Sequence, residues 1–314
     1  MAGCLDRWMS ELPPEVRRRP LNRLAIPGSH DSLSYSLGGG AESCPAEPAP
    51  DLSPAALVGL YRCAPRLARP LLVRWVVTQQ LSVTDQLAAG VRYLDVRAAL
   101  HGGQLHVVHG LHGPPLAPLL AEVRRFLADR PGELVILDLQ HVYGVGSGGA
   151  ARLSALLADT FGDSLVPRGE AAPSLEACAA AGQSVLAVYR GGSGDWSAAG
   201  HPLLWDERAL SSPWPDTQSV SRLFSLLERH MARAVRHAAG RLHVQQCVLT
   251  PQTSGVLLRA GSSMRRLAEN CNSAAAAWLP GQSVERGLNI VMLDFVGVGD
   301  HPLVEMVVNK NYER

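Results

Sequence analysis

The stretch that decides the fold is LAPLLAEVRRFLADRPGELVILDLQH, residues 116–141. Residues 116–130 form an amphipathic helical segment, and Pro131-Gly132 marks its end. Residues 134–141 (LVILDLQH) follow as a nearly continuous apolar run, which is typical of a strand buried in a parallel sheet. A helix followed directly by such a strand is the repeating unit of an α/β fold.

The same alternation extends in both directions. Helices are expected at 175–182, at 220–240 and from near Ser262. The expected strands are 23–30, 91–98, 105–110, 134–141, 184–190, 203–205, 241–250 and 288–297. About eight strands, mostly separated by helices, favour a (β/α)₈ TIM barrel. A Rossmann sheet is disfavoured because no GxGxxG motif follows the first strand. We expect one domain over residues 1–314, with a core from about 8 to 302.

Three glycine-rich stretches interrupt this pattern. Residues 38–54 (GGGAESCPAEPAPDLSP) predict a flexible loop, and residues 190–202 predict a second irregular region. Residues 144–150 (GVGSGGA) also predict a loop. They lack a following Gly-Lys-Ser/Thr, so a P-loop is not expected there.

Composition narrows the function classes. The 314 residues carry a formal net charge of +1, which argues against nucleic-acid binding. The N-terminus has no signal-peptide core and, with Ala2 after the initiator Met, no myristoylation pattern. No apolar run is long enough to predict a transmembrane helix. The six cysteines show no CxxC pairing, so we expect reduced thiols and a cytoplasmic protein.

Polar residues collect where the expected strands end. In a parallel barrel these ends meet on one face, where the chemistry of such folds takes place. The set is His30, Asp31, Asp95, Arg97, His109, Asp138, Gln140, His141, Arg190, Gln245, Gln246 and Asp294. Histidines, carboxylates and arginines together suit acid–base chemistry on an anionic substrate.

Structural interpretations remain open at this point. His30 and His109 also fit ordinary turn or strand-end histidines. Arg97 could serve only to neutralise Asp95, and Asp138 could have a purely structural partner. Arg190 also fits an exposed loop residue, His106 fits a structural one, and one of Gln245 and Gln246 fits an ordinary strand residue.

The combination of motifs resembles the X domain of phosphatidylinositol-specific phospholipase C, in the form found in short X-domain-containing proteins. The motifs are IPGSHDS (26–32), GVRYLDVR (90–97), HVVHG (106–110), RPGELVILDLQH (130–141) and LNIVMLDFVG (288–297). WMSELPP (8–14), SPWPDT (212–217) and QCVLTPQ (246–252) add to the resemblance. It covers almost the whole chain and implies a distorted TIM barrel.

The resemblance also implies roles for the matching positions. His30 corresponds to a general base that deprotonates the inositol 2-hydroxyl, and His109 to a general acid that protonates the departing diacylglycerol oxygen. Asp294 corresponds to the carboxylate that orients the base. Asp31 and Asp95 correspond to carboxylates near the acid. The products implied are diacylglycerol and a cyclic or acyclic inositol phosphate.

The resemblance separates two branches by their metal requirement. Calcium-dependent members place acidic ligands where this chain has Arg97 and Gln140, and calcium requires several oxygen ligands. Bacterial members place an arginine at the position of Arg97 and need no metal. We therefore expect no cofactor and no metal ligand. Arg190, Gln246 and Gln140 are the candidate substrate contacts, although an acidic residue is expected at the position of Gln246.

The expected partner is phosphatidylinositol at a membrane surface, bound peripherally, with no nucleic acid. Residues 73–77 (VRWVV), with Pro65-Arg66 and Arg69-Pro70, are the candidate contact patch, although they also fit an ordinary helix. One alternative is a weakly active or inactive barrel that binds phosphoinositides or acts as a scaffold. Another is a different phosphodiesterase, such as a glycerophosphodiesterase-like or sphingomyelinase-D-like enzyme, which needs a divalent ion.

Overall fold

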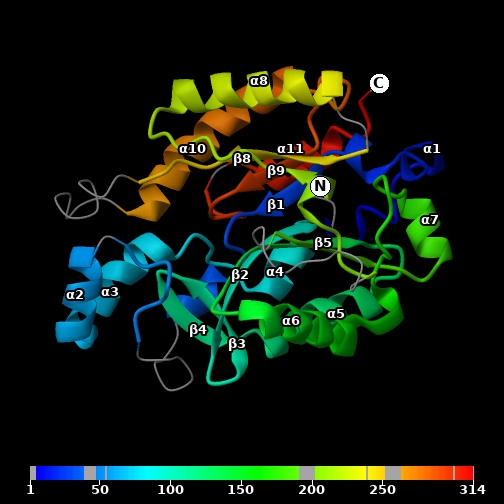
Figure 1. The fold of residues 1–314 in the computed structure, drawn as a ribbon. Coiled ribbons are helices and arrows are strands. Elements are labelled where there is room, and N and C mark those ends of the chain that lie inside the picture. Colours follow the sequence, from blue (N-terminus) through cyan, green and yellow to red (C-terminus); the bar gives the residue numbers. More distant parts are fainter. Residues whose placement is uncertain are drawn as a thin grey trace.

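The computed structural model describes residues 5–38, 47–53, 55–190, 202–237, 240–251, 263–299 and 301–313. Parallel strands form the centre of the molecule, and helices cover them on opposite sides (Figure 1). The predicted loop 38–54 and the irregular region 190–202 fall partly outside these residues. So do Gln252 of the motif 246–252 and Ser262, near which a helix was expected to begin.

The strands build a distorted barrel. They are β1 (Ile26–Ser29), β2 (Tyr93–His101), β3 (Gln104–His109), β4 (Leu111–Pro115), β5 (Val135–Tyr143), β6 (Val185–Tyr189), β7 (Leu210–Ser211), β8 (Leu242–Cys247) and β9 (Ile290–Leu293). Parallel pairing runs β6-β5-β2-β1-β9-β8-β7. No pairing joins β6 to β7 among the described residues, so the ring is open there. The predicted fold class, a distorted (β/α)₈ barrel, is confirmed.

Two expected strands differ in detail. The strand predicted at 105–110 is β3, but it pairs antiparallel with both β2 and β4 instead of joining the parallel ring. The cause is the tight turn Gly102-Gly103, whose positive φ values of 55° and 81° suit a two-residue hairpin. The strand predicted at 203–205 is reduced to one parallel bridge between Trp205 and Val188.

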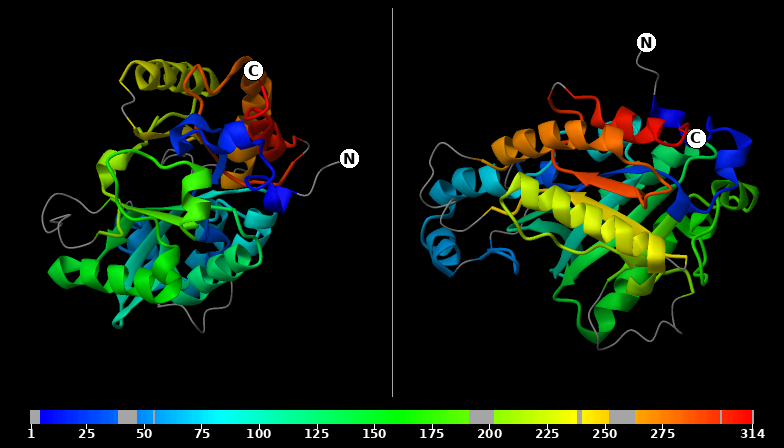
Figure 2. Two further views of the ribbon diagram at one scale, coloured as in Figure 1. Left: turned by 90° about the vertical axis from the view of Figure 1, so that its right-hand side faces the viewer. Right: turned by 90° about the horizontal axis from the view of Figure 1, so that it is seen from above.

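The helices lie outside the strands. They are α1 (Pro14–Arg17), α2 (Ala55–Cys63), α3 (Pro65–Val76), α4 (Val83–Ala88), α5 (Leu116–Ala128), α6 (Gly146–Phe161), α7 (Leu175–Ala180), α8 (Val220–His237), α10 (Met264–Trp278) and α11 (Leu303–Asn309). The helices expected before β5, β6, β8 and β9 are present as α5, α7, α8 and α10. Figure 2 shows α8 and α10 beside each other over the sheet.

The loop predicted at 144–150 is wrong over most of its length, because α6 begins at Gly146. The segment that follows, residues 151–161, holds apolar residues at helical spacing, and both Leu153 and Leu157 are completely buried. Packing of this apolar face outweighs the low helix propensity of the glycines in the first turn.

The two ends of the chain meet at β1. All four residues of β1 pair with β9, from Ile26 opposite Ile290 to Ser29 opposite Leu293. Asn311, just after α11, accepts a hydrogen bond from the backbone N–H of Ala25 at 2.9 Å and donates one to the Ala25 carbonyl at 2.8 Å. The strand that leads into the predicted site is therefore held by the last part of the chain.

Two further predictions concern the whole chain. No helix in the described ranges is long and apolar enough to cross a membrane. The four cysteines in those ranges, Cys63, Cys178, Cys247 and Cys271, are free thiols.

Candidate active site

The turn after β1 presents His30 and Asp31 at the carboxyl end of the barrel. Asp31 has a φ of 40°, in the left-handed region that Asp tolerates better than most residues. Gln79 and Thr78 each donate a side-chain hydrogen bond to the His30 carbonyl, both at 2.9 Å. The backbone N–H of Asp31 donates to a carboxylate oxygen of Asp95 at 3.1 Å. These bonds hold the turn in a backbone shape that would otherwise cost free energy.

Carboxylates surround the His30 ring, which is only 4% exposed. Its Nδ1 donates to Asp294 at 2.7 Å, while its Nε2 lies 3.3 Å from Asp31 and 3.9 Å from Asp95. Burial opposes the charged ring, but the charges of Asp31 and Asp294 outweigh it and raise the pKa of His30 to about 9. The Asp294 contact fixes the tautomer, so Nε2 is the atom available for proton transfer.

Arg97 Nη2 lies 3.0 Å from His30 Nε2, which matches a neutral ring because two cationic donors repel each other. The raised pKa favours the charged ring instead. The carboxylates outweigh the guanidinium at this ring, since three of them lie within 4 Å of it and only one guanidinium does. Arg97 Nη2 also has another acceptor, Gln140 Oε1, at 3.1 Å.

His109 lies across the site, with its ring centre 6.2 Å from that of His30. Its Nδ1 donates to the carbonyl of Val76 at 2.7 Å, and its Nε2 lies 3.1 Å from Asp31 Oδ2. Two acceptors at that distance need a proton between them, so the His109–Asp31 pair carries one. Burial and Arg97 lower the pKa of His109 to about 4, while burial raises the pKa of Asp31 above its ordinary value.

Arg97 is the cation at the centre of the site. Its Nε forms an ion pair of 2.5 Å with Asp31, and its Nη2 lies 3.4 Å from Asp95. Burial alone would raise the pKa of Asp95, but Arg97 and His30 outweigh it and hold that pKa below its ordinary value. The interpretation that Arg97 only neutralises Asp95 is too narrow, because its closest carboxylate is Asp31 and it also contacts His30.

Asp138 and Arg190 form a second charged group. Asp138 is completely buried and accepts two hydrogen bonds from Arg190, at 2.9 and 2.6 Å, and one from the Tyr93 hydroxyl at 2.5 Å. Burial raises the pKa of Asp138 to about 6, although Arg190 opposes this. Asp138 thus has the structural partner that the sequence left open, and Arg190 is a fixed cation at the end of β6.

Gln246 does not line the site directly. It is completely buried, and its side-chain amide donates to the carbonyl and the hydroxyl of Ser212, at 3.0 and 2.9 Å. This holds the loop after β7, which carries Trp214. The Trp214 ring is 43% exposed, and its centre lies 5.7 Å from that of His30. Sequence reasoning missed Trp214 as a site residue, although the motif 212–217 places an aromatic side chain between two prolines.

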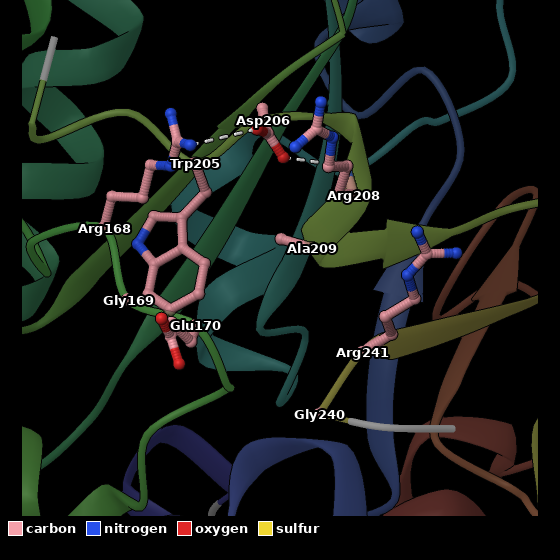
Figure 3. A pocket seen from close by; sticks show the side chains of 9 residues that line it. All are labelled: Arg168, Gly169, Glu170, Trp205, Asp206, Arg208, Ala209, Gly240 and Arg241. Atoms are coloured by element: carbon pink, nitrogen blue, oxygen red, sulfur yellow. Dashed lines mark hydrogen bonds and ion pairs between the residues drawn. The ribbon is translucent and has the colours of Figure 1, made fainter. Parts of the chain in front are cut away.

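One surface hollow lies next to this cluster, and another lies away from it. One of about 250 Å³ reaches His109 and is lined by Asp51, Leu57, Trp75 and Pro251, among others. The other, of about 460 Å³, lies beside Gly240 and Arg241 at the start of β8 (Figure 3). It contains none of the predicted site residues, and its Arg168 pairs with Asp206 at 3.3 Å.

The same carboxylates are the candidate metal ligands of this site. Within the described parts of the chain, one group of three metal-ligating side chains has its ligand atoms within 4.8 Å of one another: His30, Asp31 and Asp95. Arg97 forms ion pairs with both carboxylates. A guanidinium in this position repels a divalent cation and supplies the charge that it would bring. The donor set therefore does not fit calcium, which needs six or more oxygen ligands.

The fold is that of phosphatidylinositol-specific phospholipase C. The enzyme from Listeria monocytogenes superposes with a TM-score of 0.68 at 19% identity, over 98% of both chains. A structure of the S. aureus enzyme gives a TM-score of 0.67 at 17% identity, over 97% of both chains.

Relatives by sequence identify the family. Bovine PI-PLC X domain-containing protein 3 is 32% identical over 312 residues, which covers 97% of this chain and 93% of the relative. Human PI-PLC X domain-containing protein 1 is 34% identical over 301 residues, covering 93% and 88%. A scan against protein-family models found no match. The chain belongs to the PI-PLC X domain-containing proteins, as its motifs predicted.

Proposed function

We propose that the chain is a metal-independent phosphodiesterase that cleaves phosphatidylinositol-type lipids into diacylglycerol and an inositol phosphate. The observation that supports this most is the arrangement of two histidines around one guanidinium. His30 and His109 lie 6.2 Å apart between ring centres, and Asp31 contacts both rings and Arg97. In this proposal His30 is the proton acceptor, His109 is the proton donor, and Arg97 is the fixed positive charge that meets the phosphate.

In the first step, the neutral form of His30, the form that accepts from Arg97 Nη2 at 3.0 Å, takes the proton of the inositol 2-hydroxyl at Nε2, and that oxygen attacks phosphorus. The bond from phosphorus to the diacylglycerol oxygen breaks, and the leaving oxygen receives the proton that His109 shares with Asp31. The product is a cyclic phosphodiester. Attack by water, with the two roles reversed, would open it. Asp294 stabilises the imidazolium that forms at His30.

Arg97 stabilises the phosphate charge in this proposal. A guanidinium binds two phosphate oxygens at once, and its partly buried position strengthens the interaction. Because Arg97 is already held by Asp31 and Asp95, it needs little reorganisation when the substrate binds. No divalent ion is required for this role.

The headgroup would be bound by residues around the two histidines. Arg190, fixed by Asp138, and Gln140, next to Arg97, offer donors for ring hydroxyls or phosphates. The exposed ring of Trp214 offers a flat apolar surface beside His30 for the inositol ring. Gln246 acts through Ser212 and the loop that carries Trp214.

The lipid surface would be met by α2 and α3. The exposed large apolar residues here are Leu60, Leu67 and Leu71, at 44, 75 and 57%, with exposed Arg66 nearby. Of the predicted patch, residues 73–77 with Pro65-Arg66 and Arg69-Pro70, Val76 is buried and packs against the core, whereas Arg66 is exposed. Apolar side chains next to a cation suit the headgroup region of a bilayer. The carbonyl of Val76, the last residue of α3, accepts the hydrogen bond from His109, so α3 connects this surface to the candidate active site.

The test is release of water-soluble inositol phosphate from phosphatidylinositol vesicles in excess EDTA. We expect turnover in wild type and its loss, by at least about a hundredfold, in His30→Ala and in His109→Ala. His301→Ala, which removes an exposed histidine, is the matched control. Strict dependence on an added divalent ion would contradict the metal-free mechanism. Vesicle binding without turnover would identify a binding or scaffolding barrel instead.

A further inference from the structure

Three histidines gather on the β2–β3–β4 hairpin, outside the site described above. They are His101, His106 and His112. Ala99 pairs with His106, and Val108 pairs with His112, so alternation along the strands directs all three side chains to one face. The ring centre of His101 lies 6.0 Å from that of His106 and 5.6 Å from that of His112.

The hydrogen bonds of two of these rings leave a nitrogen lone pair available. His106 Nδ1 donates to the carbonyl of Gly113 at 3.0 Å, which fixes the tautomer with an unprotonated Nε2. A backbone carbonyl on the second nitrogen is the usual support of a metal-bound histidine. His112 is only 5% exposed, and its Nδ1 has no hydrogen-bond partner among the described residues. An unpartnered buried nitrogen is costly unless something binds it.

The separations of the His101 ring from the rings of His106 and His112 are close to what a tetrahedral ion needs. Zinc–nitrogen bonds of about 2.0–2.1 Å at tetrahedral angles place the centres of two imidazole rings roughly 5 Å apart. The nitrogens of these three histidines do not all lie within 4.8 Å of one another, as the ligand atoms of His30, Asp31 and Asp95 do. His101 is the movable member, because its side chain is 37% exposed at the end of β2. Zinc binding would require this ring to rotate toward the other two. The carboxylate of Glu47, which lies 4.0 Å from His101 Nδ1, is available as a fourth ligand.

We propose that His101, His106 and His112, with Glu47, form a zinc-binding site on the outer end of the hairpin. Three imidazoles and one carboxylate are a ligand set that zinc accepts, with water able to replace the carboxylate. The site is separate from the catalytic cluster.

Zinc here would fasten the segment 47–53 onto the hairpin. Ala49 of this segment packs with Ala99 and Val108 on the same face of the hairpin. Asp51 accepts a hydrogen bond from the backbone N–H of Gly110 at 2.9 Å and lines the hollow that reaches His109. Binding at Glu47 would therefore stabilise one wall of the candidate active site without contributing a group to the chemistry.

The experiment is calorimetric titration of the metal-stripped full chain with Zn²⁺ alone, followed by Co²⁺ as a spectroscopic probe. We expect one equivalent bound in wild type and at least about tenfold weaker binding in His101→Ala and Glu47→Gln. His101 and Glu47 are partly exposed, so these variants should fold, and a thermal melt in EDTA checks this. Bound Co²⁺ should show the visible absorption of a tetrahedral site.

Two controls separate this site from others. His301→Ala removes an exposed histidine elsewhere, and Asp95→Asn alters the catalytic carboxylates; both should keep the zinc equivalent. Loss of binding in Asp95→Asn with retention in His101→Ala would place the metal in the catalytic cluster and overturn the proposal. Equal affinity in wild type and His101→Ala would also overturn it. Neither result depends on turnover, so the proposal fails or stands independently of the proposed enzyme activity.

Discussion

Removing Asp294 should lower the pKa of His30 and change how the stability of the fold depends on pH. The folded protein holds the pKa of His30 at about 9, against 6.5 ordinarily. Between these values the folded state keeps a proton that the unfolded state has lost, so the free energy of unfolding falls as the pH rises. At about 1.4 kcal/mol per pKa unit, the loss reaches about 3 kcal/mol. This stabilisation is complete below pH 6.5 and absent above about pH 9.

The assay is thermal unfolding from pH 6 to 10, with NMR titration of the His30 ring in parallel. For a chain of this size, about 3 kcal/mol corresponds to a fall in Tm of roughly 5 °C. Asp294→Asn and His30→Gln should each reduce this pH dependence, whereas His301→Gln should leave it unchanged. A flat profile in wild type, or a His30 midpoint below pH 7, would refute the argument that carboxylates outweigh burial at this ring.

Other substitutions test other parts of the site. Arg97→Gln should reduce turnover in EDTA by about 10²–10³-fold, and rescue of that variant by calcium would contradict the fixed-cation role of Arg97. Asp138→Asn should destabilise the fold by about 2–4 kcal/mol in urea unfolding, because Arg190 loses a buried partner; the same cost in an Arg190→Gln background would show that the pair is not coupled. Trp214→Ala should raise KM more than it lowers kcat, and Trp214→Tyr should restore most of the loss; an unchanged KM in the alanine variant would remove Trp214 from the headgroup site.

The barrel was predictable because buried parallel strands leave nearly continuous apolar runs, as in β5 and β9. The antiparallel hairpin was not, because the apolar pattern of residues 105–110 fits a parallel and an antiparallel strand equally well. The signal that could have identified it is Gly102-Gly103, a two-residue turn of the kind that joins antiparallel strands. The start of α6 was not predicted because glycine has a low helix propensity. Burial of the apolar face that contains Leu153 and Leu157 outweighs that propensity.

The polar cluster was predictable for a related reason. Charged residues such as Asp294 stand out inside apolar strands, and the ends of parallel strands meet on one face. The partners of each residue depend on tertiary distances, and the sequence does not contain these directly. The pairing of Asp138 with Arg190, the position of Trp214 beside His30, and the role of Gln246 behind Ser212 each required the folded chain.

The pairing of β1 with β9 also affects the order in which the protein can assemble during synthesis. His30 and its partner Asp294 are 264 residues apart, and Ala25 and Asn311 are 286 residues apart. The turn that carries His30 leaves the ribosome well before the groups that hold it, which lie more than 260 residues later in the chain. Contacts of such long range form late and leave apolar strand edges uncovered in the nascent chain. Residues 5–289 alone would therefore expose β1, and chaperone demand should be highest just before β9 emerges.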